Sequence, residues 1–532
     1  MTHEKNGEIV LDLADMFERG AVFADRWPTA VRVQLDVANP LTEAVRDALL
    51  GRRHVVVAGA AGDGKSHLAM TVLDDWAPSA YYEVVSGANL PTGLAPGTVV
   101  FLRDVSALTY DDVVSAIATA QDQSLTLLIT INEGPLDSLA TKDGTGFLAC
   151  VRDVIHQRSR GLDVPDPENA TVINLNGRQL TRGDFVAGAL AKILPVVRPC
   201  RTCGKAKTCP RVVGARELKK SKDAQARIAK LLRMLTDRGR HLTAREIWTF
   251  LIDLFFGWTC GDADNEVERQ NGYFWTRVFA ADNAISEAIR SDFDPLQVAR
   301  ASDDAHIWTG DGPVTVPDAP PYIVARSDPD DGLEMFASAK RHFFFFSKEW
   351  DVDATLAAFV PASRFGRLLE RATGADQIAP EMVGLINAFR LGAKTQADLW
   401  ISRHHAFGSH RRPDVLAASG KVPSSSLTVR VPHLADRNAY PKSDFFPDHL
   451  LLCWNDKDPE LVVDFPTWKE LQNDRNLIVD RNQETLDFAL DIFLAQGDPP
   501  DARDPEVLVY DHRRQRETQL RLSSSDRKIE VL

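Results

Sequence analysis

The 532-residue chain lacks any long hydrophobic run, and no stretch approaches the roughly 18 apolar residues needed to cross a bilayer. The N-terminus, Met1–Lys5, does not open as a signal peptide. We therefore expect no membrane insertion, no export and a cytoplasmic location. Cysteine is also scarce, since six residues in a chain of this length exclude a disulfide-stabilised scaffold. Internal repeats and long low-complexity tracts are absent as well.

The composition excludes disordered and fibrous classes, because 44% apolar and 26% charged residues are ordinary for a globular protein. At about 150 residues per domain, the length predicts three or four domains. The net charge of −13 argues against a surface that coats nucleic acid everywhere. Residues 198–245 nevertheless hold 15 Lys and Arg against 3 Asp and Glu. This basic segment indicates either a polyanion contact or an ordinary solvated helix face.

The first half of the chain alternates apolar strands with helical segments. Helical spacing is expected over 41–50 and 65–76, and the helical pattern returns over 184–256. Continuous apolar runs predict five strands of a parallel sheet that is covered on both faces. These strands are 54–58, 80–85, 98–102, 125–131 and 171–175.

The second half is harder to interpret from its pattern. Residues 309–332 are rich in Asp, Pro and Gly and predict a loop or linker. The run Arg341–Phe346 is expected to be a buried strand. Four further strands and a helix over 483–495 predict a separate α+β region; the strands are 427–431, 450–454, 461–463 and 507–510.

Residues 59–66, Gly-Ala-Ala-Gly-Asp-Gly-Lys-Ser, match the phosphate-binding pattern G-x-x-x-x-G-K-S between a strand and a helix. Glycines let the backbone curl so that its N–H groups face phosphates, and the helix N-terminus adds partial positive charge. Lys65 is expected to reach the β- and γ-phosphates of ATP, and Ser66 to bind Mg²⁺. The nucleotide-binding residues are therefore Gly59, Gly62, Asp63, Gly64, Lys65, Ser66 and His67.

Two other strand ends carry candidate catalytic groups. Asp104 follows the strand over 98–102 and is expected to hold the metal with Ser66; the alternative is that it caps a turn. The next residue is Val105, where many phosphate-loop ATPases have a catalytic Glu. Asn132 and Glu133 follow the next strand, where Asn132 can orient the attacking water and Glu133 can polarise it, unless both cap the following turn.

This order of features resembles that of the AAA+ ATPases. The resemblance implies a sheet order of 5-1-4-3-2, a helical lid and an oligomer in which a neighbour supplies an arginine. In the lid, Thr243 is a plausible N-cap and Arg245 takes the position of an arginine that reaches back to the γ-phosphate, or else makes a surface salt bridge. Candidates for the neighbour's arginine are Arg158, Arg160 and Arg178.

A finer resemblance covers roughly residues 54–260 and is limited to motifs. The segments 61–67, 103–106 and 132–134, together with the cysteine cluster, are similar to ATPases of bacterial phage-defence systems, in particular those of DNA phosphorothioation-dependent restriction. The resemblance implies a role in defence or restriction, with defence-complex proteins and DNA as partners.

Cys200, Cys203 and Cys209 lie within ten residues. Two thiolates at C-x-x-C spacing and a third nearby favour Zn²⁺, which prefers four nitrogen or sulfur ligands; buried or redox thiols are the alternative. Cys260 or His241 would complete the set. A second cluster, residues 403–412, packs three His and three Arg together, and a solvated loop is the favoured interpretation.

The sequence thus predicts an α/β phosphate-loop ATPase of AAA+ type. The expected parts are an ATPase core (1–190), a helical lid with the cysteine cluster (191–308), a linker (309–332) and an α+β C-terminal region (333–532). The expected function is an ATP-hydrolysing switch or motor on or near nucleic acid. The alternative, favoured by Val105, is a nucleotide-dependent scaffold with weak hydrolysis that recruits an effector. A small-metabolite kinase is disfavoured, because the chain is over twice the length of a usual kinase core.

Overall fold

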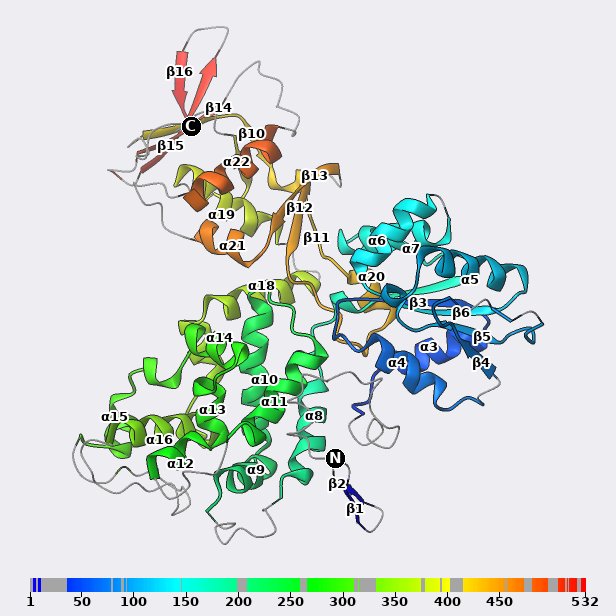
Figure 1. The fold of residues 1–532 in the computed structure, drawn as a ribbon. Helices are drawn as coiled ribbons and strands as arrows, with labels where there is room; N and C mark the ends of the chain where they lie inside the picture. The colour runs from blue at the N-terminus through cyan, green and yellow to red at the C-terminus, as the bar shows by residue number, and fades with distance from the viewer. Residues whose placement is uncertain are drawn as a thin grey trace.

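The structure is a computed structural model in which an α/β sheet domain, a helical body and a C-terminal region lie around a common centre (Figure 1). The residues that it describes are 3–5, 8–10, 36–77, 80–87, 90–91, 93–144, 146–198, 208–258, 266–310, 314, 332–374, 378–392, 395–401, 415–454, 457–472, 481–495, 506–511, 514, 516–523 and 528–532. No described helix is both long enough and apolar enough to span a membrane.

The sheet domain is built on five parallel strands, as the apolar runs predicted. Their order across the sheet is β4 (Tyr81–Glu83), β5 (Val99–Leu102), β6 (Thr126–Ile131), β3 (His54–Ala58) and β7 (Ala170–Asn174). All four neighbouring pairs are parallel. Numbered along the chain, this is the order 5-1-4-3-2 that the AAA+ resemblance implied.

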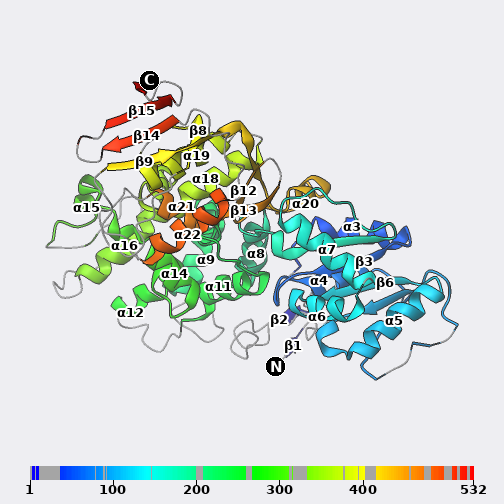
Figure 2. The ribbon, with the colours of Figure 1, turned by 90° about the horizontal axis from the view of Figure 1, so that it is seen from above.

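Alternation along the strands sends side chains to two separate cores. Val55 and Val57 pack with α3 (Leu41–Leu50) and α4 (Lys65–Leu73). Val56 and Ala58 face the opposite core. Successive residues of a strand point to opposite faces, so these runs must be apolar throughout. The opposite core is covered by α5 (Tyr110–Asp122), α6 (Glu133–Asp143) and α7 (Phe147–Ser159), as Figure 2 shows.

The helical body begins after β7 and confirms the helical pattern expected over 184–256. Its first helices are α8 (Phe185–Ile193), α9 (Pro210–Lys220), α10 (Lys222–Asp237) and α11 (Ala244–Phe256). The shorter helices that follow are α12 (Glu266–Asn271), α13 (Phe274–Ala280), α14 (Ala284–Asp292) and α15 (Ala301–Ile307). Three more helices, which were expected in the C-terminal region (333–532), pack into the same core and complete the helical body: α16 (Gly332–Phe346), α17 (Val352–Phe359) and α18 (Pro361–Thr373).

The prediction of a strand at Arg341–Phe346 is wrong, because these residues form the last turns of α16. A short apolar run does not distinguish a buried strand from a buried helix. The C-terminal half of this helix is buried on several sides, and the buried cations Lys340 and Arg341 each pair with a carboxylate. Lys340 Nζ lies 2.8 Å from a carboxylate oxygen of Asp304, and Arg341 lies 2.6 Å from Asp294.

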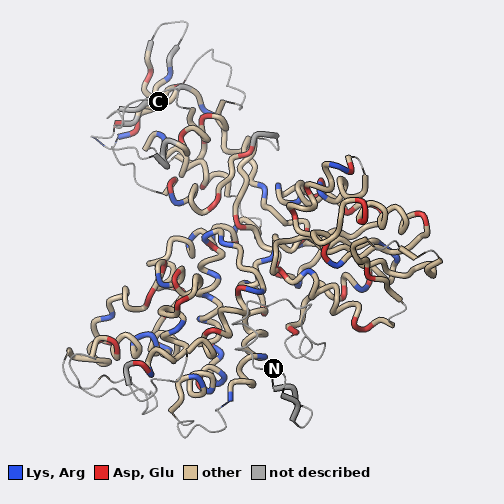
Figure 3. The backbone as a smooth tube through the Cα atoms, in the orientation of Figure 1, with Lys and Arg blue, Asp and Glu red and all other residues tan. Residues whose placement is uncertain are grey.

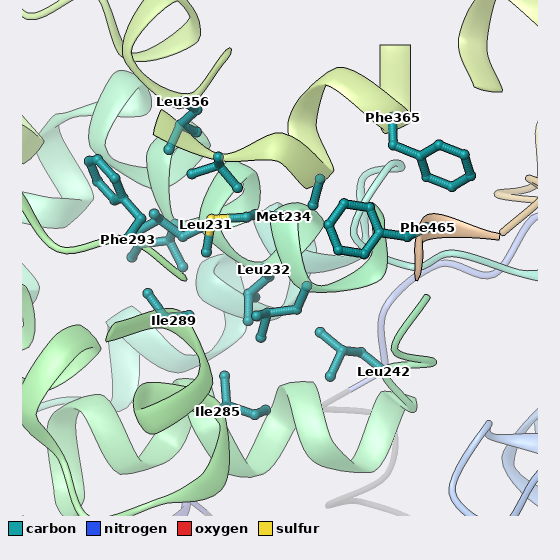
Figure 4. Packing of buried hydrophobic residues seen from close by; sticks show 14 of the residues in the cluster. Leu231, Leu232, Met234, Leu242, Ile285, Ile289, Phe293, Leu356, Phe365 and Phe465 are labelled. Atoms are coloured by element: carbon teal, nitrogen blue, oxygen red, sulfur yellow. The ribbon is translucent and has the colours of Figure 1, made fainter. Parts of the chain in front are cut away.

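One hydrophobic core continues from the helical body into the C-terminal region. Figure 4 shows Leu231 and Leu232 of α10 packed with Ile289, Phe365 and Phe465. These side chains come from segments on both sides of residues 309–332. Most of that expected linker lies outside the described residues.

The C-terminal region contains the predicted strands and helix. An antiparallel sheet joins β11 (Leu427–Arg430), β12 (Leu450–Trp454) and β13 (Lys457–Val463). A second has the order β16 (Lys528–Val531), β15 (Arg516–Ser523), β14 (Glu506–Asp511) and β9 (Val415–Ser419), and β10 (Lys421–Pro423) pairs with β8 (Asp398–Trp400). The helices are α19 (Ala379–Leu391), α21 (Phe465–Gln472) and α22 (Arg481–Ala495). A short hairpin, β1 (His3–Lys5) with β2 (Glu8–Val10), lies at the N-terminus.

Residues 431–449, here called the crossing segment, leave the C-terminal region between β11 and β12 and pack against the sheet domain. They contain α20 (Leu434–Ala439), which Figure 1 shows beside the sheet domain. Phe445 joins the core under α3 and α4 and pairs with Arg178 in an isolated bridge. The Phe446 amide donates to the Gly177 carbonyl at 3.0 Å. The C-terminal region is thereby attached directly to the end of β7.

Candidate functional site

The loop over residues 59–66 connects β3 to α4 through three glycines with positive φ. Gly64 is the N-cap of α4 and has a φ of 89°. This left-handed conformation is unfavourable for any residue that carries a Cβ, so it favours glycine. At Gly59, an added Cβ would lie 3.0 Å from both Asp63 Oδ2 and Leu175 Cβ. The three glycines therefore allow the backbone of this loop to curl, as the sequence predicted.

Lys65 is buried at the start of α4, and its ammonium group folds across the loop. Its Nζ donates to the carbonyls of Gly59 at 2.9 Å and Ala60 at 2.7 Å. Burial lowers the pKa of this ammonium group from its ordinary value. Four nearby charges also act on that pKa; Asp63, Asp104 and Glu133 raise it, and Arg245 lowers it. The candidate residues from separate strand ends and from the helical body therefore converge on Lys65.

Asp104 lies at the end of β5 and is exposed. Its Oδ1 accepts from the Ser106 amide at 3.1 Å and from the Ser106 hydroxyl at 2.5 Å. The carboxylate thus caps the turn over 105–107, which was the alternative interpretation, while remaining close enough to act on Lys65. Ser66 is half-buried in the first turn of α4. A serine hydroxyl and a carboxylate are hard oxygen ligands, so this pair suits Mg²⁺ chemically.

At the end of β6, Asn132 is the N-cap of α6 and its side chain makes no capping hydrogen bond. Glu133 follows, and its Oε1 accepts from Asn174 Nδ2 at 2.9 Å. Asn176 lies two residues after Asn174, and its Oδ1 accepts a hydrogen bond from the Ala60 amide at 2.6 Å. Neither asparagine was predicted as a site residue from the sequence, although Asn-Leu-Asn at the end of a buried strand is a detectable signal.

The helical body touches the loop through residues 238–243, here called the lid loop, and the start of α11. Thr243 forms a capping box with Glu246, as its N-cap position predicted. The Arg245 amide donates to the Gly62 carbonyl at 3.2 Å. His241 Nε2 lies 2.7 Å from Asp63 Oδ1, and this hydrogen bond is the main cause that raises the pKa of His241. His241 therefore belongs to the loop contact and is not placed as a free fourth zinc ligand.

A cavity of about 1570 Å³ opens beside the loop. Its lining combines residues 62–67 with residues 36–40, α8 and the start of α11. His67, one of these residues, lies 2.8 Å from Asp36 through its Nε2. Lys442 and Asp444 of the crossing segment also line it. The cavity exceeds the roughly 300–1000 Å³ typical of ligand pockets, so it has room for a nucleoside triphosphate.

A second cavity of about 210 Å³ is lined by Glu133, Asn174, His241 and Asp448, among others. A bound water occupies about 30 Å³ of liquid volume, so several waters fit there. Glu133 therefore borders a space that can hold water, as a residue that polarises water requires.

The prediction that Arg158 or Arg178 reaches into a neighbouring subunit is wrong. Arg158 is buried and lies 3.1 Å from Asp436 and 3.0 Å from Asp166. Arg178 is also buried and lies 3.0 Å from Asp444. Neither guanidinium can leave its partner and extend into another chain without exposing a buried carboxylate. The side chain of Arg160 remains 43% exposed and pairs with Glu460 at 3.0 Å.

The cysteine cluster is only partly visible. Cys200, Cys203 and Cys260 lie outside the described residues, as does the whole His- and Arg-rich cluster over 403–412. Cys209 is a free, half-buried thiol directly before α9. Among the described residues, no group of three or more His, Cys, Asp or Glu side chains is arranged to hold a metal ion.

Several cations of the basic segment form ion pairs or hydrogen bonds with other parts of the same chain. Lys230 lies 2.7 Å from Asp353 of α17, and Arg233 pairs with Glu370 of α18. Arg227 Nη2 donates to the Ser347 carbonyl at 2.7 Å. Figure 3 shows cationic and anionic residues interspersed over the helical body. The local charge of α10 therefore contributes to docking α17 and α18.

The chain matches no protein-family model, no curated protein and no solved structure.

Proposed function

We propose that the protein binds ATP with Mg²⁺ at the loop over residues 59–66 and hydrolyses it as an AAA+-type switch or motor. The observation that carries this proposal is the position of Lys65. It is a buried cation on a glycine loop, and Asp104, Glu133 and Arg245 all act on it from separate elements. A site of this kind combines phosphate binding with groups that can act on an attacking water.

Each residue then has a distinct role. The loop amides and Lys65 bind the phosphates, and Ser66 and Asp104 hold Mg²⁺, which neutralises charge on the phosphate oxygens. Glu133 accepts a proton from the attacking water, and Asn132 orients that water. Arg245, in the first turn of α11, detects the phosphates. The direct contact of α11 with Gly62 supports a switch in which the nucleotide sets the angle of the helical lid.

Steady-state turnover of Mg²⁺·ATP tests this function, with Asp104→Ala as the variant. Removing a metal-holding carboxylate should abolish turnover and leave nucleotide binding largely intact. Asp111→Ala, an exposed acid at the start of α5, is the matched control. Wild-type turnover in Asp104→Ala would remove Asp104 from the site.

The second candidate is a nucleotide-dependent scaffold with weak hydrolysis that recruits an effector. Two observations favour it: Val105 occupies the position after Asp104, and Asp104 is hydrogen-bonded to Ser106. ATP binding without multiple turnovers would favour the scaffold, and sustained turnover would favour the motor.

We also propose that the protein acts on or near nucleic acid in bacterial anti-phage defence. The resemblance of its motifs to those of defence ATPases supports this part of the proposal. Lys219, Lys220 and Lys222 are exposed cations of the basic segment, and we expect them to contact phosphates. Their reversal to Glu should weaken DNA binding regardless of sequence and reduce its dependence on salt. No binding of DNA or RNA by the wild type at low salt would favour the scaffold.

A further inference from the structure

The carboxylate of Asp63 uses its two oxygens in two directions. Oδ2 accepts from the Ala60 amide at 2.7 Å and closes the loop on itself. Oδ1 lies 2.7 Å from His241 Nε2 in the lid loop. The Asp63 side chain is 3% exposed, so one buried group connects the phosphate loop to the helical body.

A carboxylate at this position needs a counter-charge. Asp63 Oδ2 and Lys65 Nζ both hydrogen-bond to the backbone of Ala60, so the carboxylate lies near the cation expected to bind phosphate. An unpaired carboxylate there would repel a polyphosphate, because two like charges about 4 Å apart interact by several kcal/mol near a protein surface. The imidazole N–H of His241 offsets that charge and fixes the direction of the carboxylate.

A second contact joins the same two elements independently. The Arg245 amide donates to the Gly62 carbonyl. An added Cβ at Gly62 would lie 3.1 Å from the Thr243 hydroxyl and 3.2 Å from Arg245 Cβ. The start of α11 therefore rests directly on the loop, and the helical body contacts residues 59–66 at two points, His241 and Arg245.

We infer that His241 is a positioning residue, which holds the Asp63 carboxylate against the loop and thereby couples the lid to the phosphate site. This inference rests on the proposed ATP binding and names the residue pair that would regulate it. The alternative is that His241 only stabilises the fold and has no effect on coupling. The His241 side chain is polar and 32% exposed, so truncation removes less buried apolar surface than a core substitution does and should affect coupling more than folding.

The test combines four variants with titration calorimetry of Mg²⁺·ATP: His241→Ala, His241→Gln, Asp63→Asn and the double variant Asp63→Asn/His241→Ala. A hydrogen bond to a charged group predicts about tenfold weaker ATP binding in His241→Ala. His241→Gln keeps a donor near the position of Nε2 and should restore affinity to within about threefold. In the Asp63→Asn background, His241→Ala should have no further effect, because the charge that it neutralises is gone. His306→Ala, an exposed histidine of α15, is the matched control.

Unchanged affinity in His241→Ala, full additivity in the double variant, or failure of His241→Gln to improve on His241→Ala would each overturn the inference. Hydrogen exchange without nucleotide provides a second readout over residues 59–66 and 240–247. Faster exchange of both segments in His241→Ala is expected, and unchanged exchange overturns the coupling. If the wild type binds no ATP, the proposed function fails while this exchange comparison still decides the link between Asp63 and His241.

Discussion

The side-chain amide of Asn174 donates a hydrogen bond of 2.9 Å to Oε1 of Glu133. It joins the ends of β7 and β6, which lie on either side of β3 in the sheet. The contact orients the Glu133 carboxylate, and both residues line the cavity of about 210 Å³. A catalytic base needs such orientation, because proton transfer requires the acceptor within hydrogen-bond reach of the attacking water.

Glu133→Gln should therefore trap ATP. The substitution keeps the shape of the side chain and removes the proton acceptor, so turnover should fall at least about 100-fold while ATP binding persists. Single-turnover assays with radiolabelled ATP measure both. Glu287→Gln, at an exposed position of α14, is the control. Normal turnover in Glu133→Gln would mean that another acid polarises the water.

The contact between Asp63 and His241 should depend on pH. The hydrogen bond to Asp63 raises the pKa of His241 above 6.5, Glu246 and Asp448 add to this, and burial opposes it. The protonated form is thus favoured in the folded protein. Its contribution to lid attachment should be full below about pH 6.5 and should be lost as pH rises through the raised pKa. Hydrogen exchange of residues 240–247, corrected for intrinsic rates, should accelerate over that range in the wild type but not in His241→Gln. Equal profiles would contradict this assignment.

The crossing segment should contribute strongly to stability. Asp436 is 1% exposed and pairs with the buried Arg158 at 3.1 Å, so Asp436→Ala removes one of the two carboxylates that compensate this buried cation. We expect the free energy of unfolding to fall by about 3 kcal/mol in urea titrations. Asp153→Ala, which removes the 55% exposed partner of Arg152, should cost less than about 1 kcal/mol. Similar losses in the two variants would argue against anchoring by the crossing segment.

The purified protein should contain about one zinc ion per chain, because Cys200, Cys203 and Cys209 have the spacing of a thiolate site. Cys203→Ser should lower the zinc content and destabilise the helical body, since structural zinc contributes to folding. Elemental analysis of protein prepared without chelators measures this. Cys453→Ser, at a buried cysteine of β12, is the control. Zinc-free wild-type protein would leave these residues as ordinary thiols.

Local pattern predicted the sheet well, because a strand covered on both faces must be apolar at consecutive positions, as 55–58 and 127–129 are. The same reasoning failed at Arg341–Phe346, where a buried helix has an equally apolar run. The contacts of Asp63 with His241 and of Arg158 with Asp436 could not be predicted. Their partners are 178 and 278 residues apart, and only the tertiary fold brings them together.

Titration of the wild type and of Lys65→Ala with Mg²⁺·ATP is the decisive measurement for a phosphate site at residues 59–66. We expect measurable binding by the wild type and at least tenfold weaker binding by Lys65→Ala, a difference of about 1.4 kcal/mol. Lys219→Ala, at an exposed lysine of α9, should bind as the wild type does. Equal affinities of the wild type and Lys65→Ala, or no binding by the wild type, would contradict a phosphate site at residues 59–66.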